Sequence, residues 1–404
     1  MGKEFSRIIK KIDGYKPEMI NTMSKMIAIK SVSPLSGGTG EKKRAEFLKK
    51  VLEGWGLHTK IYSYKDSTKT DRSNVIGVFG DKKRTLWIMP HIDTVSEGDI
   101  KLWKTNPYQA KVIGGKVYGR GTSDNGQDVI SAMFALKALK EARANIKYNY
   151  GIALVADEEL GSEYGVKKLI KESIFKQNDM YLVPDSGNSK GDEIEIAEKG
   201  ALWLKITVHG KQVHASIPHM GKNAFRYSVK FLEKVDAYLH KKYTKRNKLF
   251  KIAPGSTFEM TKHEKNVDSV NIIPGTEVFY IDCRVLPEYS LDSVLSDVQR
   301  IAKGKDFKGV KISIDVFNRA DSAKPTSPKS EISKLLKKSI LSVNGTKAKF
   351  VGIGGGTVAA FFRYKGWPAV VWAKIEEVAH SPNEYAHIDD MLTDAKVFAK
   401  LFVD

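Results

Sequence analysis

Short apolar runs alternate with polar turn segments through the first half of the chain. Three of these runs occupy residues 85–89, 150–156 and 180–183. Continuous apolar runs of this length, bounded by turn residues, are typical of strands buried in a parallel sheet. Apolar residues at helical spacing fill 127–142 and 165–174. The alternation of strand, loop and helix predicts βαβ units and an α/β domain with a mixed, mostly parallel sheet.

The pattern changes near Gly200. We expect strands at 201–208, 256–261, 277–285 and 310–317, and helices at 223–240 and 291–302. The order β-α-β-β-α-β is that of a ferredoxin-like α+β unit. The apolar side of the first helix is expected to carry Phe225, Val229, Leu232 and Val235.

Acidic and imidazole side chains follow the predicted strands of the first half, and one more histidine comes late in the chain. They are His91, Asp124, Glu158, Glu159, Asp185 and His380. The carboxyl ends of strands open onto the crevice where α/β proteins bind ligands. Imidazole and carboxylate groups suit zinc, with cobalt and manganese as alternative ions. Two histidines and three carboxylates supply enough donors for two ions if one carboxylate bridges them.

The adjacent glutamates Glu158 and Glu159 are expected to have different tasks. Successive side chains diverge, so the two cannot easily bind one ion. One glutamate on a metal and its neighbour on the metal-bound water is the better division. A metal lowers the pKa of its bound water toward ~7, and a nearby carboxylate can accept the proton. The pattern therefore predicts a metal-dependent hydrolase.

The ordered motifs HIDTV, GRGTSDNG, VADEELG, YLVPDSG, GGGT and VAHSPNE resemble the aminoacylase, carboxypeptidase G and succinyl-diaminopimelate desuccinylase family of zinc metallopeptidases. The resemblance extends from about Lys16 to Phe402. The chain departs from the family just after Asp124. Members often have Lys-Gly after this aspartate and the residue that follows it, whereas this chain has Gly126-Gln127 after Asp124-Asn125. This departure lies outside the metal ligands and leaves the substrate open.

The resemblance implies a role for each residue of the centre. Asp124 would bridge two zinc ions. His91 and Asp185 would complete one site, and Glu159 and His380 the other. Glu158 would be the general base. Asp93 would hydrogen-bond the imidazole of His91 and fix its tautomer; the nearby His387 is left as an ordinary histidine.

A second set of residues is implied for the inserted segment and the substrate pocket. His214, in VHGKQVHAS, would reach the active site of a partner subunit and stabilise the oxyanion, so a homodimer is expected. Asn271, Arg284, Gly355, Gly356 and Thr357 match family positions near the substrate. Arg319 is a further candidate for a substrate carboxylate, because a guanidinium offers two parallel donors.

The position of His380 beyond the ferredoxin-like segment predicts that this segment is an insertion. We expect a catalytic domain at 1–199 and 319–404 and a lid and dimerisation domain at 200–318. The stretch Pro325-Thr326-Ser327-Pro328 indicates a hinge back to the first domain.

Composition bounds the class of protein. The chain has 404 residues and a net charge of +20, from 67 Lys and Arg against 47 Asp and Glu. This charge would suit a nucleic-acid surface, but no finger, RNP-like motif or long basic tail accompanies it. A lysine-rich, solvated exterior is the better interpretation, and neither a nucleic-acid nor a membrane partner is expected. Cys283 is the only cysteine, so no intrachain disulfide is expected, in agreement with a cytoplasmic protein. The amino-terminal residues predict no signal peptide, and no apolar run predicts a membrane span.

The leading interpretation is metal-dependent hydrolysis of an amide bond in a small N-acyl amino acid or peptide with a free carboxylate. Deacylase, desuccinylase, carboxypeptidase and dipeptidase activities all remain open. One alternative is a non-catalytic metal-binding relative, which the retention of Glu158 and of every ligand disfavours. The other is a basic nucleic-acid-binding protein.

Overall fold

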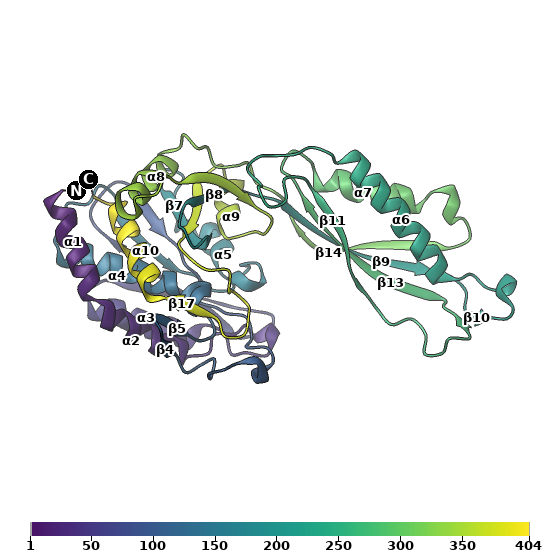
Figure 1. Cartoon of the computed structure of the whole chain (residues 1–404), viewed down its shortest axis with the longest axis horizontal. Coiled ribbons are helices and arrows are strands. Elements are labelled where there is room, and N and C mark those ends of the chain that lie inside the picture. The colour runs from purple at the N-terminus through teal and green to yellow at the C-terminus, as the bar shows by residue number, and fades with distance from the viewer. Residues whose placement is uncertain (1, 404) are drawn as a thin grey trace. The chain divides into compact units, whose positions relative to one another are not determined.

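The computed structural model describes residues 2–403, which form two compact units (Figure 1). The first unit extends to Ile196 and resumes over Pro325–Phe350 and from Thr357 onward. The second comprises Ala197–Lys324 and Val351–Gly356. The sequence analysis predicts that residues 351–356 belong to the catalytic domain. They cluster with the second unit because their main chain bonds to it, through Gly352 N to Leu249 O and Lys199 N to Ile353 O.

The first unit is built on an eight-stranded sheet of order β1-β2-β6-β3-β7-β16-β8-β15. The strands are β1 Thr59–Lys65, β2 Asp71–Phe79, β3 Thr85–Ile88, β6 Asn149–Leu154, β7 Met180–Gly187, β8 Glu193–Glu198, β15 Lys349–Ile353 and β16 Ala369–Ala373. The expected mixed sheet is confirmed. The central strands β6-β3-β7-β16 pair in parallel, whereas β1 with β2, β2 with β6 and β8 with β16 pair antiparallel, so the sheet is less parallel than the sequence predicts.

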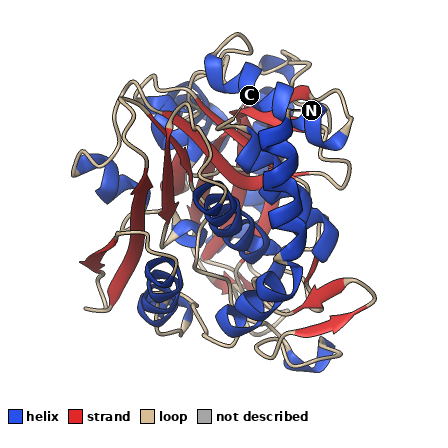
Figure 2. Ribbon diagram, turned by 90° about the vertical axis from the view of Figure 1, so that its left-hand side faces the viewer, coloured by secondary structure: helices blue, strands red, loops and turns tan. Residues whose placement is uncertain are grey.

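Helices pack along these strands (Figure 2). They are α1 Lys3–Gly14, α2 Lys16–Ile27, α3 Lys42–Gly54, α4 Gln127–Glu141, α5 Val166–Lys171, α8 Glu331–Asn344, α9 Ala359–Tyr364 and α10 Ile388–Lys400. Helix α4 is buried on all sides from Gln127 to Leu139, and apolar residues occur on all of its sides, as in a helix enclosed by the rest of its domain. A small sheet of β4 Lys111–Ile113, β5 Lys116–Tyr118 and β17 Tyr385–His387 completes the unit.

Strands of the second unit form an antiparallel four-stranded sheet of order β11-β13-β9-β14. Its strands are β9 Gly200–His209, β11 Thr257–His263, β13 Thr276–Val285 and β14 Lys311–Ala320, and its helices are α6 Ala224–Lys242 and α7 Leu291–Ala302. This order is that of a ferredoxin-like unit. The sequence did not predict the ribbon of β10 Val213–His214 and β12 Ile272–Ile273.

The buried face of α6 differs from the one expected. Phe231 and Val235 are fully buried, whereas Phe225 and Val229 are about half exposed, at 47% and 49%. The helix therefore buries one face in its own unit and leaves a second apolar strip uncovered. Within the described residues, no helix has the length and apolar character needed to cross a membrane.

Candidate active site

The predicted ligands come from loops at one edge of the central sheet. His91 follows β3, Glu158 and Glu159 follow β6, and Asp185 lies near the end of β7. Because these strands are mutually parallel, their carboxyl ends meet at the same edge. His380 lies in the loop after β16, which is parallel to β7. All of these residues belong to the first unit.

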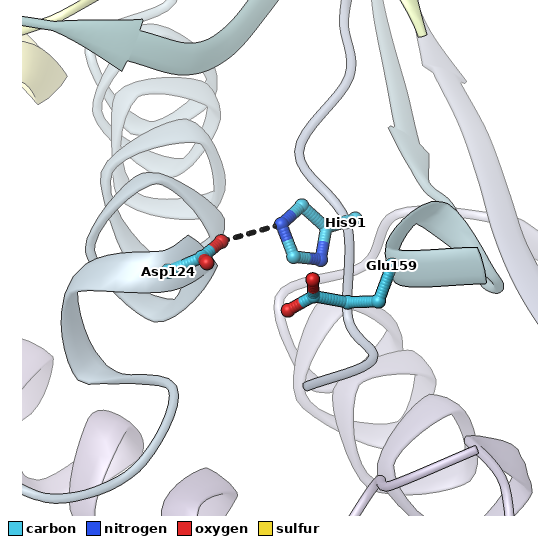
Figure 3. Close-up of side chains that lie close together, drawn as sticks. All are labelled: His91, Asp124 and Glu159. Carbon is cyan, nitrogen blue, oxygen red and sulfur yellow. Dashed lines mark hydrogen bonds and ion pairs between the residues drawn. The ribbon is translucent and has the colours of Figure 1, made fainter. Parts of the chain in front are cut away.

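Asp124 lies between the two histidines. Its Oδ1 is 2.8 Å from His91 Nε2, and its Oδ2 is 3.0 Å from His380 Nε2. Asp185 Oδ1 is 3.3 Å from the same nitrogen of His91. Glu159 Oε2 is 3.1 Å from His380 Nε2. Side chains of His91, Asp124 and Glu159 converge in Figure 3. The two oxygens of Asp124 thus face two different histidines, His91 and His380.

The donor set fits divalent cations. Ligand atoms of His91, Asp124 and Glu159 all lie within 4.8 Å of one another, and so do those of His91, Glu158 and Asp185. Four carboxylates share this space with two imidazoles, so the cluster carries an excess of negative charge. Imidazole and carboxylate are the ligands of zinc hydrolase centres. The charge and the chemistry of the cluster therefore suit two metal ions.

The pKa values show the same crowding. Burial raises the pKa of Asp185, Glu158 and Glu159 above their ordinary values. Burial also acts on Asp124, but hydrogen bonds with His380 and His91 outweigh it and lower its pKa. Hydrogen bonds to Asp124 and Glu159 raise the pKa of His380 to about 10. The carboxylates thus hold positive charge on the imidazoles, a charge that metal ions would replace.

Asp93 contacts both sides of the site. Its main-chain oxygen lies 3.1 Å from His91 Nδ1, and its Oδ1 lies 3.4 Å from the same nitrogen. Its carboxylate also accepts hydrogen bonds from the backbone nitrogens of Glu158 and Glu159, each at 3.1 Å. One fully buried carboxylate therefore orients the His91 ring and the turn that carries the glutamate pair.

Glu384 and Arg120 are functional candidates that the sequence analysis missed. Both are buried and form an ion pair at 2.7 Å. Glu384 accepts hydrogen bonds from the backbone of the Asp124 turn, and burial raises its pKa to about 7. Both residues stand inside the quoted motifs GRGTSDNG and VAHSPNE. In the sequence, each of them is recognisable only as a charged residue four positions from a candidate ligand. Nothing in the sequence indicates that the two residues pair with each other.

The glycines of the GRG motif have a local explanation. Gly121 adopts a φ of 77°, and a Cβ there would lie 2.4 Å from Thr94 Cγ2. Only glycine fits this backbone and this contact. The following turn, Thr122–Gly126, leads into α4, so the close approach at Gly121 helps to place Asp124.

His214 and Asn271 lie together on the small ribbon of the second unit. His214 pairs with Ile272, and Asn271 O accepts a hydrogen bond from Ala215 N. The His214 ring is exposed, and its Nδ1 accepts from Ser216 N at 3.1 Å. A neutral ring with an accepting Nδ1 carries its proton on Nε2.

The two arginines proposed for substrate are engaged with carboxylates of the same unit. Arg284 forms a fork with Asp282 at 2.7 and 3.0 Å, and its Nη1 donates to Gly354 O at 3.3 Å. The exposed Arg319 binds Asp321 and Asp292. Arg284 and the glycine-rich loop therefore lie side by side, whereas Arg319 belongs to an ion-pair cluster.

The remaining predicted residues fall into three settings. Gly355 and Gly356 are exposed, with open space where a Cβ would be. Thr357 is buried and accepts a hydrogen bond from Ala359 N, at the start of the six-residue helix α9. His387 lies 3.8 Å from Glu376 and belongs to neither ligand group.

A mixed α/β sheet with a carboxylate–imidazole centre at its strand ends defines a metallohydrolase-like fold and site. Residues 87–404 match the model of "Peptidase family M20/M25/M40", and the chain belongs to this family. It is therefore a metal-dependent hydrolase of peptide or amide bonds, as the sequence predicted.

Several proteins are similar along most of their length. An uncharacterized metallohydrolase of Methanocaldococcus jannaschii is 39% identical, covering 95% of this chain and 98% of that protein. The succinyl-diaminopimelate desuccinylase of Rickettsia bellii is 26% identical, covering 91% and 92%. An M20 family metallo-carboxypeptidase of Sulfolobus solfataricus has the same fold, with a TM-score of 0.76 at 21% identity, covering 95% and 98%.

Proposed function

We propose that the protein is a two-metal hydrolase that cleaves the amide bond of a small N-acyl amino acid or peptide with a free carboxylate. The observation that carries the proposal is the position of Asp124, whose two oxygens each face a different histidine. Such a carboxylate suits a bridge between two ions. Similarity to a protein named as a desuccinylase supports a small acylated substrate.

His91 and Asp185 would hold one ion, and Glu159 and His380 the other, with Asp124 shared. When bound, two zinc ions would polarise the scissile carbonyl and acidify the attacking water; cobalt and manganese suit the same donors.

Glu158 is the general base in this proposal. Its carboxylate accepts a proton from the attacking water and later donates it to the leaving nitrogen, so the proton balance closes over one turnover. Asp93 keeps the Glu158 backbone in place through the hydrogen bond to its nitrogen. A carboxylate oxygen of Glu158 lies within 4.8 Å of ligand atoms of His91 and Asp185, so the base is next to the proposed metal centre. This proximity is what proton transfer to and from the reacting atoms requires.

The second unit serves as lid and dimerisation domain in this proposal. Its outer strand β11 and the uncovered strip of α6 line a groove of about 230 Å³ that contains Phe225, Val229 and Met260. A second copy of the chain could cover such an edge through a two-fold axis. The Nε2–H group of His214 in one subunit would then donate a hydrogen bond to the oxyanion in the other.

The carboxylate of the substrate is assigned to the region of Arg284 and the neighbouring glycine-rich loop. The guanidinium is held in a fork by Asp282, which fixes its plane, and its Nη1 already contacts the loop at Gly354. Asn271, Arg319, Gly355, Gly356 and Thr357 remain further candidates for substrate contacts. The acyl group on the other side of the bond is open.

Metal-free protein reconstituted with excess zinc tests the proposal. We expect two bound ions per chain by elemental analysis, and amide hydrolysis of N-acyl amino acids. In a matched pair of substrates, one with a free and one with an amidated α-carboxylate, the free acid should have the much higher kcat/KM. One ion per chain would contradict the bridge, and equal kcat/KM values would contradict the substrate class.

A further inference from the structure

The carboxylate of Glu384 is fully buried, and it accepts four hydrogen bonds. Its Oε1 accepts from Ser123 N at 2.9 Å and Asp124 N at 3.0 Å. Its Oε2 accepts from Gly121 N at 2.9 Å and Arg120 Nη1 at 2.7 Å. Charged acceptors form the stronger class of hydrogen bond. One side chain from the carboxy-terminal region therefore fixes the backbone of the turn that carries Asp124.

Arg120 extends the same network to the second histidine. Its guanidinium is 2% exposed, and its Nη2 donates to His380 O at 3.3 Å. Glu384 itself follows His380 by four residues in the same loop. The ion pair therefore joins the main chain at Asp124 to the main chain at His380. These are the two residues whose side chains meet at 3.0 Å.

Stability alone does not explain this pair. A buried ion pair often contributes no more to folding than well-packed apolar residues would, because both charges lose their hydration. The Arg120–Glu384 pair does, however, hold two loops that are distant in sequence at a fixed spacing. Side chains that orient metal ligands commonly control metal affinity in this indirect way.

We propose that Arg120 and Glu384 are positioning residues that hold Asp124 and His380 at the spacing needed to bind metal. This inference rests on the metal-binding role proposed above for Asp124 and His380. The pair touches neither metal nor substrate in this proposal; it acts through the backbone of the two ligands.

A second buried ion pair provides a matched control. Glu195 on β8 binds Arg363 on α9, with the Glu195 Oε1–Arg363 Nη1 distance at 2.8 Å and side-chain exposures of 2% and 1%. Arg363 donates hydrogen bonds to Glu195, Thr326 and Ala369, and none of these three is a candidate ligand. The two pairs are alike in burial and charge, and the Arg120–Glu384 pair is bonded to the main chain of two candidate ligands.

The experiment compares Glu384→Gln with Glu195→Gln. An amide turns an NH2 group toward two of the four donors around residue 384, whichever way it is oriented. Zinc affinity of the folded, metal-free proteins is measured by competition with a chromogenic chelator, and Co²⁺ absorption spectra report the ligand geometry. We expect the zinc dissociation constant of Glu384→Gln to rise ~10–100-fold, with an altered Co²⁺ spectrum. Glu195→Gln should keep wild-type affinity even if its Tm falls.

Unchanged metal affinity and spectrum in Glu384→Gln would overturn the inference, as would equal losses in both variants. If Glu384→Gln does not fold, Arg120→Lys decides. A lysine keeps the charge near Glu384 but presents one nitrogen in place of the two that bond Glu384 and His380 O, so a smaller loss of affinity is expected, and no loss would contradict us. Asp124→Asn separates this inference from the proposed function. Wild-type affinity in that variant would refute the metal centre itself, whatever Glu384 does.

Discussion

Proton transfer is the task that we propose for Glu158 and not for its neighbour Glu159. Glu158→Gln keeps the size of the side chain but removes the acceptor for the proton of water. We expect kcat to fall by at least ~10²–10⁴-fold, while the number of bound metal ions stays unchanged by elemental analysis. The control is Glu163→Gln, because Glu163 is exposed and pairs with Lys167, four residues further along the chain. A near-normal kcat of the Glu158→Gln enzyme would show that another residue is the general base.

Single residues of the centre were predictable where their chemistry is unusual at strand ends. His91, Glu159 and Asp185 follow apolar runs, and such positions rarely carry buried polar groups without a function. Glu384 and Arg120 were not predictable in the same way. Their pairing joins positions 264 residues apart, and a glutamate or arginine in a loop is usually solvated. Only the folded chain shows that both are buried and that each of the Glu384 oxygens accepts two hydrogen bonds.

Elements were predicted well where one periodicity dominated. The helix expected at 291–302 is α7, with the same bounds. The predicted apolar side of helix α6 is only partly buried: Val235 and Leu232 pack in the core, whereas Phe225 and Val229 are exposed, because apolar residues occupy two sides of the helix. Periodicity marks apolar positions, but it cannot tell which strip packs against the sheet of the same unit and which stays exposed. The β10–β12 ribbon is too short for any periodic signal.

Asp297 on α7 joins this helix to the end of α6. Its Oδ2 accepts from Lys242 Nζ at 2.6 Å and Tyr243 Oη at 2.7 Å, and its Oδ1 pairs with Arg300 at 3.2 Å. Asp297→Asn should lower the free energy of unfolding by about 2 kcal/mol at pH 7, because hydrogen bonds to a charged group are lost. Urea unfolding measures the difference. The control, Asp236→Asn on the exposed side of α6, should change stability little.

The effect of Asp297 should depend on pH in one direction. Burial alone would raise its pKa, but hydrogen bonds from Lys242, Tyr243 and Arg300 hold the pKa below the ordinary value. A folded-state pKa below the unfolded value of ~3.9 stabilises the protein above that pH. The difference between wild type and Asp297→Asn should therefore persist from pH 7 to about pH 4 and shrink as the pH falls further. A constant difference down to pH 3 would contradict the charge-based explanation.

On the scale of the whole molecule, the late position of His380 predicted an insertion between two parts of one catalytic domain. The segment Val351–Gly356 could not be assigned in this way. It lies between elements of the first unit in sequence, and its main-chain bonds to Leu249 and Lys199 attach it to the second. This attachment places the glycine-rich loop beside Arg284, a neighbourhood that spacing along the chain does not reveal.

The proposed sharing of active sites between two subunits makes a prediction about mixed dimers. Glu158→Gln and His214→Ala should each be nearly inactive alone. After the two are unfolded and refolded together, half of the dimers are hybrid, and each hybrid keeps one site with Glu158 from one subunit and His214 from the other. Mixing should therefore restore about a quarter of the wild-type kcat per chain, because a two-fold dimer has two equivalent sites. The measurement is the rate of amide hydrolysis by the refolded equimolar mixture, in which the heterodimer fraction has been verified.

A second mixture distinguishes a histidine acting across the dimer from one acting within its own subunit. Wild type refolded with the double variant Glu158→Gln/His214→Ala leaves hybrids with no intact site if His214 acts across, so about a quarter of the activity survives. If His214 acts within its own subunit, each hybrid keeps one intact site and about half survives. In that case the two single variants would also fail to restore each other. Recovery in the first mixture together with the lower value in the second would place His214 in the partner's site and make the dimer the catalytic unit.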